Sequence, residues 1–276
     1  MIADQRAGDY FFIVGCSRSG TTLLSVLLDR HSRLCVTPET AFFDEIAPQL
    51  AAISDERSLL RLLRQWRRLP ELHLEPESVL QHLAQQHRQP TAGNLLASLL
   101  DLYAHGQGKQ RGGEKTPQHL AHVATITRCF PNAKFICLLR DGREVALSLR
   151  AMPWWGSSDL QAAANHWKLC LRQMESCVQQ YPAQFQVIKF EELVSQPEAT
   201  LTIVMDYLGE RFEPDQLRTD LPSGVVLERS REWKGQALEP VDATRISGRR
   251  EKASTAEIAF LEQALSDDLR RYGYLP

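Results

Sequence analysis

One stretch near the N-terminus, residues 10–24, constrains the fold of this 276-residue chain more than any other. It begins with an apolar run rich in Phe, Ile and Val, which is typical of a buried strand. Small polar residues follow between Gly15 and Gly20, and leucines then recur at helical spacing. The pattern predicts a strand, a tight loop and a helix. The amides of such a loop and the start of the helix form a site for an anion, usually a phosphate.

This loop departs at one position from the P-loop of nucleoside triphosphatases. Gly15 and Gly20 have the separation found in G-x-x-x-x-G-K-[ST], but Thr21 stands where that motif has its lysine. The cation within the loop is Arg18. A triphosphatase would lose the ammonium group that reaches the β- and γ-phosphates, whereas a protein that binds an anion without a γ-phosphate would lose much less. An ordinary glycine-containing turn is the other explanation of the loop.

Composition excludes several classes of protein. Hydrophobic residues make up 43% and charged residues 24% of the chain, as in ordinary globular proteins. The formal net charge of −2 predicts no nucleic-acid partner. There is no apolar run of membrane-spanning length, and residues 1–9 lack the apolar core of a signal peptide, so we expect a cytoplasmic protein. The six cysteines form no C-x-x-C pair and show no cysteine–histidine spacing of a zinc site, so we expect buried thiols and no metal.

The clearest later strand, residues 133–139, ends in a second candidate anion site. Arg140 follows this strand, and Ser148 lies about two turns along the helix that comes next. A guanidinium group makes two charged hydrogen bonds and a hydroxyl group makes a third, so both can hold one phosphate. An ion pair of Arg140 with Asp141 or Glu144 is the alternative.

Glu39 and Lys115 also follow predicted strands. Pro38 ends a short strand at residues 33–37 just before Glu39, and Lys115 stands where a strand passes into a helix. Strands that alternate with helices are expected to be parallel, so these strand ends share the edge at which α/β proteins bind ligands. Taken alone, a carboxylate at a helix start and a surface lysine explain the two residues equally well.

Two long segments show no strand pattern. Residues 44–113 are predicted to be a helical insertion that covers the acceptor side of the site, including an arginine-rich helix at residues 57–69. Residues 211–253 are irregular and end in a basic cluster, and loops of this length in compact domains are usually functional lids. We expect residues 1–276 to form a single domain.

Together these motifs resemble the sulfotransferases that use 3′-phosphoadenosine 5′-phosphosulfate (PAPS), in the branch of tyrosylprotein, carbohydrate and bacterial small-molecule enzymes. The loop GCSRSGTTLL is similar to the 5′-phosphosulfate loop of that family, and LRDGR with Ser148 is similar to its 3′-phosphate motif. The sequences EKTP and, near the C-terminus, RREK resemble further motifs of the branch. The resemblance implies a P-loop-like, three-layer α/β fold with a central, mainly parallel sheet, a helical insertion and a C-terminal closing loop.

The resemblance also implies roles for individual residues. Glu39 is expected to be the catalytic base, with His31 as the alternative, while Arg18 and Lys115 stabilise the leaving oxygen. The residues expected to bind the donor are Arg18, Ser19, Gly20, Thr21 and Thr22 at the 5′-phosphosulfate, Arg140 and Ser148 at the 3′-phosphate, and Arg249 in the closing loop.

The implied reaction moves a sulfuryl group from PAPS to a hydroxyl or amine by in-line displacement. It needs no metal and leaves adenosine 3′,5′-bisphosphate (PAP). The acceptor is a small molecule, a saccharide, a lipid or a peptide, and neither its identity nor the oligomeric state follows from the sequence. Two alternatives are a nucleotide-binding regulatory protein of the same fold without transfer activity, and a degenerate P-loop kinase.

Overall fold

The sheet that organises this protein has five strands, and every neighbouring pair in it is parallel. The computed structural model describes residues 9–221 and 223–276, so residues 1–8, where we expected no signal peptide, lie outside the described part. The strand order is β2-β3-β1-β4-β5. The strands are β1 (Phe11–Gly15), β2 (Leu34–Val36), β3 (Arg111–Lys115), β4 (Lys134–Leu139) and β5 (Phe185–Lys189). This architecture confirms the predicted α/β class with a central parallel sheet.

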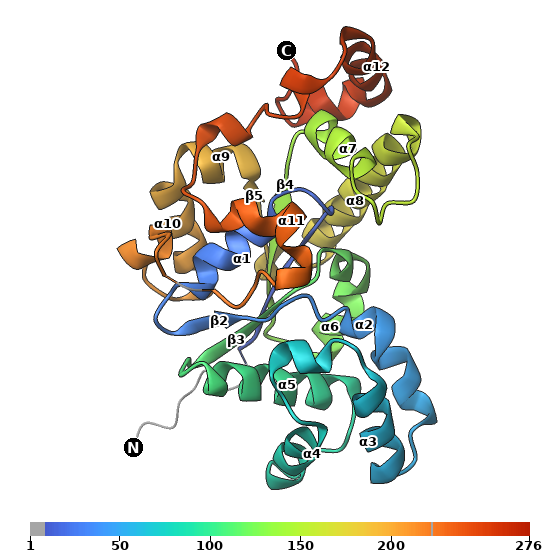
Figure 1. The fold of residues 1–276 in the computed structure, drawn as a ribbon, viewed down its shortest axis with the longest axis vertical. Coiled ribbons are helices and arrows are strands. Elements are labelled where there is room, and N and C mark those ends of the chain that lie inside the picture. The colour runs from blue at the N-terminus through green and yellow to red at the C-terminus, as the bar shows by residue number, and fades with distance from the viewer. Residues whose placement is uncertain (1–8, 222) are drawn as a thin grey trace.

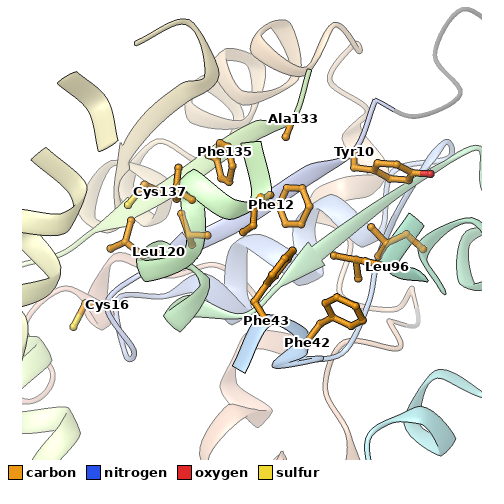
Figure 2. Close-up of a cluster of buried hydrophobic side chains, with 14 of the residues drawn as sticks. Tyr10, Phe12, Cys16, Phe42, Phe43, Leu96, Leu120, Ala133, Phe135 and Cys137 are labelled. Carbon is orange, nitrogen blue, oxygen red and sulfur yellow. The ribbon is translucent and has the colours of Figure 1, made fainter. Parts of the chain in front are cut away.

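Each face of the sheet is covered by its own hydrophobic core, because successive residues of a strand point to opposite faces. Phe12 and Val14 of β1 join one core, whereas Phe11 and Ile13 join the other. Figure 2 shows the aromatic centre of the first core, in which Phe12 and Phe135 stack with ring centroids 5.6 Å apart. The two cores make the fold three layers deep, with helices on both faces.

The helices that follow β1 and β2 include the predicted insertion. Helix α1 packs in the second core, and the others lie between β2 and β3 in the chain, at the lower end of Figure 1. They are α1 (Thr21–Asp29), α2 (Phe42–Glu45), α3 (Glu56–Gln65), α4 (Pro76–Gln85) and α5 (Ala92–Gly106). The boundaries differ from the predicted ones at the ends: α3 stops at Gln65, and the last residues of the predicted insertion belong to β3.

The remaining helices cover both faces. Helices α7, α8 and α12 contribute to the first core, and α9 and α10 to the second. They are α6 (Val123–Cys129), α7 (Gly142–Arg150), α8 (Leu160–Gln180), α9 (Phe190–Ser195), α10 (Pro197–Leu208), α11 (Arg231–Lys234) and α12 (Thr255–Arg271). None of the helices in the described ranges is both long and apolar enough to span a membrane.

The segment predicted to close the site, residues 211–253, contains α11 and several short 3₁₀ turns. Its turn at Gly235–Leu238 packs against α1, and its turn at Arg250–Lys252 packs against α7. Figure 1 shows this orange segment crossing the sheet in front of α1. The segment therefore bridges the helices that follow β1 and β4.

Candidate active site

A pocket of about 1050 Å³ lies at the carboxyl edge of the sheet. The strand order reverses around β1, and ligands of α/β proteins bind at such a switch point. The loop after β1, Glu39 after β2, Arg140 after β4 and Phe190 after β5 all line the pocket. Its other wall comes from the closing segment, including Ser230, Lys234 and Arg249.

The loop after β1 is shaped by its glycines. Gly15 and Gly20 have φ values of 143° and 98°, a region in which side chains are strained. A Cβ atom on Gly20 would also lie 2.2 Å from the ring of Phe190. No side chain within the described ranges caps α1, and Thr21, Thr22 and Leu23 line the pocket. The first turn of α1 therefore offers backbone N–H groups to an anion.

Three arginines converge on this pocket. Arg18, Arg140 and Arg249 all lie on its wall. Burial, together with the charges of Arg249 and Arg140, lowers the pKa of Arg18 to about 10. Burial also lowers the pKa of Arg140, although the carboxylate of Glu144 opposes this shift. Like charges gathered on one pocket wall are the electrostatic signature of an anion-binding site.

Arg140 is oriented by its neighbours but is incompletely paired. Its guanidinium group lies 4.2 Å from the centroid of the Phe190 ring and donates to Glu144 at 3.1 Å. It also donates to the carbonyl of Arg245 at 2.9 Å. Its Nε atom is buried and finds no hydrogen-bond partner among the residues that the structure places. A buried donor without an acceptor is costly, so this atom suits an anionic ligand.

Ser148 links the two candidate anion sites. Arg18 Nε donates to Ser148 Oγ at 3.1 Å, and Arg140 donates to the carbonyl of Arg18 at 3.3 Å. The sequence predicted one phosphate near Arg18 and another near Arg140. The two sites are neighbours at the adjacent ends of β1 and β4.

The carboxylate of Glu39 is held between two lysines. Lys115 Nζ lies 2.5 Å and Lys234 Nζ 3.0 Å from Glu39 Oε1. Burial by itself raises the pKa of Glu39, but the two ammonium charges outweigh burial and lower that pKa to about 2. Burial and repulsion by Lys115 lower the pKa of Lys234 to about 8. Glu39 is therefore ionised at neutral pH, beside a lysine that loses its proton readily.

The loop that carries Glu39 is fixed from two sides. Arg68 donates to the carbonyl of Glu39 at 3.0 Å. The next residue, Thr40, donates its hydroxyl at 2.8 Å to Glu114, a fully buried carboxylate of β3. Burial tends to raise the pKa of Glu114, but His119 and the surrounding hydrogen bonds outweigh it and lower that pKa. Glu114, next to Lys115 on the same strand, therefore keeps Glu39 close to Lys115.

The closing segment is docked onto the site through Glu144. This buried carboxylate on α7 accepts the backbone N–H groups of Arg249 at 3.2 Å and Arg250 at 2.9 Å. The segment also places the carbonyl of Trp233 3.3 Å from Arg18. Neither Glu144 nor Lys234 was singled out as part of the site from the sequence. Lys234 has no recognisable motif around it, and Glu144 was considered only as an ion-pair partner of Arg140.

Most residues predicted for the site lie on the pocket wall, and three do not. Ser19 is buried beneath the loop, and Lys115 is buried and reaches the site through Glu39. The alternative base, His31, is also buried, and its ring is engaged by the backbone. His31 Nδ1 accepts from the N–H of Arg33, and its Nε2 lies 3.0 Å from the carbonyl of Arg211. His31 is therefore a structural residue, and Glu39 is the carboxylate that reaches the pocket.

Comparison with known proteins agrees with this geometry. The model of a family described as the sulfotransferase family matches residues 10–214. The chain belongs to the sulfotransferase family. This confirms the family predicted from the two anion motifs. The matched region includes both anion motifs, Glu39 and Lys115, and it ends before α11 and Lys234.

Individual sulfotransferases are similar to this chain in sequence or in fold, at low sequence identity. Protein-tyrosine sulfotransferase 2 of Gallus gallus is 26% identical over 86% of this chain, which spans 62% of that protein. In fold, the sulfotransferase domain of the Synechococcus PCC 7002 olefin synthase is similar, with a TM-score of 0.64 and 20% identity over 94% of each chain. A mouse sulfotransferase complexed with PAP has a TM-score of 0.53 and 11% identity, over 95% of this chain and 85% of that one.

Proposed function

We propose that this protein transfers a sulfuryl group from PAPS to a hydroxyl or amine of an acceptor. The observation that carries the proposal is the joint position of the arginine cluster and the lysine-flanked Glu39 on one pocket. The first group suits a donor with two anionic ends, and the second suits removal of a proton from an acceptor. Membership of the sulfotransferase family and the PAP complex of a structural neighbour support the choice of donor.

The residues present fit such a donor. The buried Nε of Arg140, which lacks a partner in the described part of the chain, needs an acceptor. The mutual repulsion of Arg18, Arg140 and Arg249 is relieved by a ligand with several negative charges. The first turn of α1 and Arg18 would hold the 5′ end, and Arg140 with Ser148 would hold the 3′-phosphate.

When bound, PAPS supplies an activated sulfuryl group whose transfer breaks a sulfur–oxygen bond to phosphate as the acceptor oxygen or nitrogen bonds to sulfur. The protein contributes orientation and charge, as in phosphoryl transfer. Arg18 and the two lysines beside Glu39 would supply positive charge to the departing phosphate oxygen. Glu39 accepts the proton of the acceptor group.

The low pKa of Glu39 fits this role once the site is filled. A carboxylate with a pKa of about 2 is a weak base, because Lys115 and Lys234 stabilise its charge. An anionic group that enters beside these lysines shares their positive charge, so the pKa of Glu39 rises. The base is thereby strengthened when the donor is in place.

The half-exposed ring of Trp154 on the pocket wall offers the acceptor an apolar contact.

Donor binding is tested by calorimetry with PAP. Wild-type protein should bind PAP, and Arg140→Ala should weaken binding about tenfold or more, since a charged hydrogen bond contributes about 1.5–3 kcal/mol. Arg57→Ala, at an exposed position on the distant helix α3, is the control and should bind as wild type does. Tight binding of ATP with Mg²⁺ and none of PAP would instead indicate a kinase.

Transfer is tested by following radiolabelled sulfate from PAPS into a panel of phenols, saccharides, lipids and peptides. Glu39→Gln should abolish transfer while PAP affinity stays close to that of wild type. Glu75→Gln, an exposed substitution at the start of α4, should change neither. Full turnover by Glu39→Gln would exclude Glu39 as the base. If wild-type protein binds PAPS but shows neither transfer nor slow hydrolysis of PAPS, the regulatory alternative would be favoured.

A further inference from the structure

A second group of reactive side chains lies on the other side of the anion loop. Cys16 is the first residue after Gly15, and its thiol lies close to His166 and Cys170 of α8. The two sulfur atoms and one imidazole nitrogen all lie within 4.8 Å of one another. The spacing along the chain did not reveal this cluster, because Cys16 is far in sequence from the other two residues.

The distances suit a tetrahedral metal. His166 and Cys170 are four positions apart on α8, so their side chains share one face of the helix. Cys170 Sγ lies 3.6 Å from His166 Nε2. A zinc ion with bonds of about 2.3 Å to sulfur and about 2.0 Å to nitrogen separates such ligands by about 3.5 Å. The Cys16 sulfur lies within 4.8 Å of the Cys170 sulfur and of a ring nitrogen of His166.

A polar atom without a partner adds a second observation. Ser19 is 1% exposed, and its Oγ has no hydrogen-bond partner within the described residues. Ser19, Cys16 and Cys170 line one small cavity of about 10 Å³, which is close to the space that a single water requires. A metal-bound water in this cavity would give the Ser19 hydroxyl the partner that it lacks. Figure 2 shows Cys16 at the edge of the first core, away from the aromatic side chains.

We propose that Cys16, His166 and Cys170 form a binding site for a thiophilic divalent cation of the zinc type, with water as the fourth ligand. Two cysteines and one histidine with an open fourth position form a known zinc ligand set. The two thiols release their protons to solvent as the metal binds, and the two thiolates balance its charge. The ion would tie the anion loop to α8 from below the donor pocket.

The proposal does not depend on sulfuryl transfer. It predicts that metal binding stabilises the folded protein, because the three ligands come together only in the folded chain. It also places the metal outside the pocket that Glu39 lines, since none of its three ligands lies on that pocket's wall. The site would therefore be structural, with an indirect effect on the loop.

The test titrates zinc into chelator-treated, reduced protein against a colorimetric zinc indicator. Wild-type protein should bind one zinc ion per chain and gain thermal stability. Cys170→Ala and His166→Ala should bind at least about hundredfold more weakly, since losing even a partner of a ligand costs about 10–100-fold. Cys129→Ala, a partly buried thiol on α6 outside the cluster, should match wild type.

Cobalt provides a spectroscopic reading of the same site. Co²⁺ should produce a thiolate charge-transfer absorption in wild type that is lost in Cys170→Ala, and circular dichroism verifies that each variant is folded. Unchanged zinc affinity in folded Cys170→Ala and His166→Ala would overturn the proposal. The proposal would also be overturned if reduced wild-type protein binds no zinc. The same holds if the only modification found at the site is a Cys16–Cys170 disulfide that dithiothreitol reverses.

Discussion

Lys234 Nζ lies 3.0 Å from Glu39 Oε1, although one residue belongs to the closing segment and the other follows β2. Lys234 is the last residue of α11. The residue before it, Trp233, accepts a hydrogen bond from Arg18 through its backbone carbonyl. The closing segment therefore touches both the proposed base and the anion loop. This contact adds a second ammonium group to the Glu39–Lys115 pair and makes α11 part of the site.

Lys234→Ala should lower the rate of sulfuryl transfer by about tenfold or more, which is about 1.4 kcal/mol in the activation barrier. The physical reason is loss of positive charge beside the group being transferred. Single-turnover measurements with PAPS test this. Arg231→Ala serves as the control, because Arg231 begins the same helix and pairs with the exposed Glu228. Equal rates for wild type and Lys234→Ala would remove Lys234 from the mechanism.

The pH dependence should reflect the same lysine. The pKa of Lys234 is lowered to about 8, so this residue is charged below that pH and neutral above it. We expect kcat/KM for PAPS to fall as the pH rises through about 8, because this parameter reports ionisations of the free enzyme. Lys234→Arg keeps its charge at high pH and should move the fall upward. A wild-type profile that stays level up to pH 10 would contradict the assignment.

Ser19 and Ser148 should respond differently to removal of the hydroxyl group. Ser148 lines the pocket and accepts from Arg18, so Ser148→Ala should weaken PAP binding about tenfold. Ser19 is buried and lines the small cavity instead of the donor pocket, so Ser19→Ala should bind PAP within about twofold of wild type, in the range of substitutions away from a site. Calorimetry on both variants decides, and a larger loss for Ser19→Ala would show that its hydroxyl turns toward the donor.

Gly20→Ala should destabilise the protein more than Gly209→Ala. Both glycines have positive φ, 98° and 76°, so alanine costs roughly 1–2 kcal/mol at either position. At Gly209 a Cβ atom meets open space, whereas at Gly20 it meets the ring of Phe190 at 2.2 Å. Because Phe190 packs on Arg140, PAP affinity should fall as well. Urea unfolding measures the loss of stability, and calorimetry measures the PAP affinity. Equal losses of stability at both glycines would show that the Phe190 ring moves aside at no cost.

Local patterns were sufficient for much of the site. The loop at Gly15–Thr22 is specified by glycines and a strand that precede a helix, all of which are neighbours in the chain. The same holds for Arg140 and Ser148, which share a strand end and its returning helix. Glu39 was predicted because it follows a short strand, and the parallel sheet brings it to the edge where the loop lies.

Other residues depended on contacts that local patterns do not encode. Lys115 was predicted to stabilise the leaving oxygen, and the structure adds that its side chain is fully buried and bonds to Glu39. Ser19 was predicted to bind the donor, and the structure places this residue on the small cavity that Cys16 also lines. In both cases the direction of the side chain is decided by packing around the loop and the strand, which residue spacing does not describe.

By itself, the sequence determined the alternation of the main strands and helices, the anion loop and the charged residues that follow the strands. Each of these depends on short-range periodicity and on turn residues. Only the tertiary structure decided that Lys234 meets Glu39, that Glu144 anchors the closing segment, and that Cys16 lies beside His166 and Cys170. These pairs are distant in the chain, and their contacts are set by how α7, α8 and α11 pack around the carboxyl edge of the sheet.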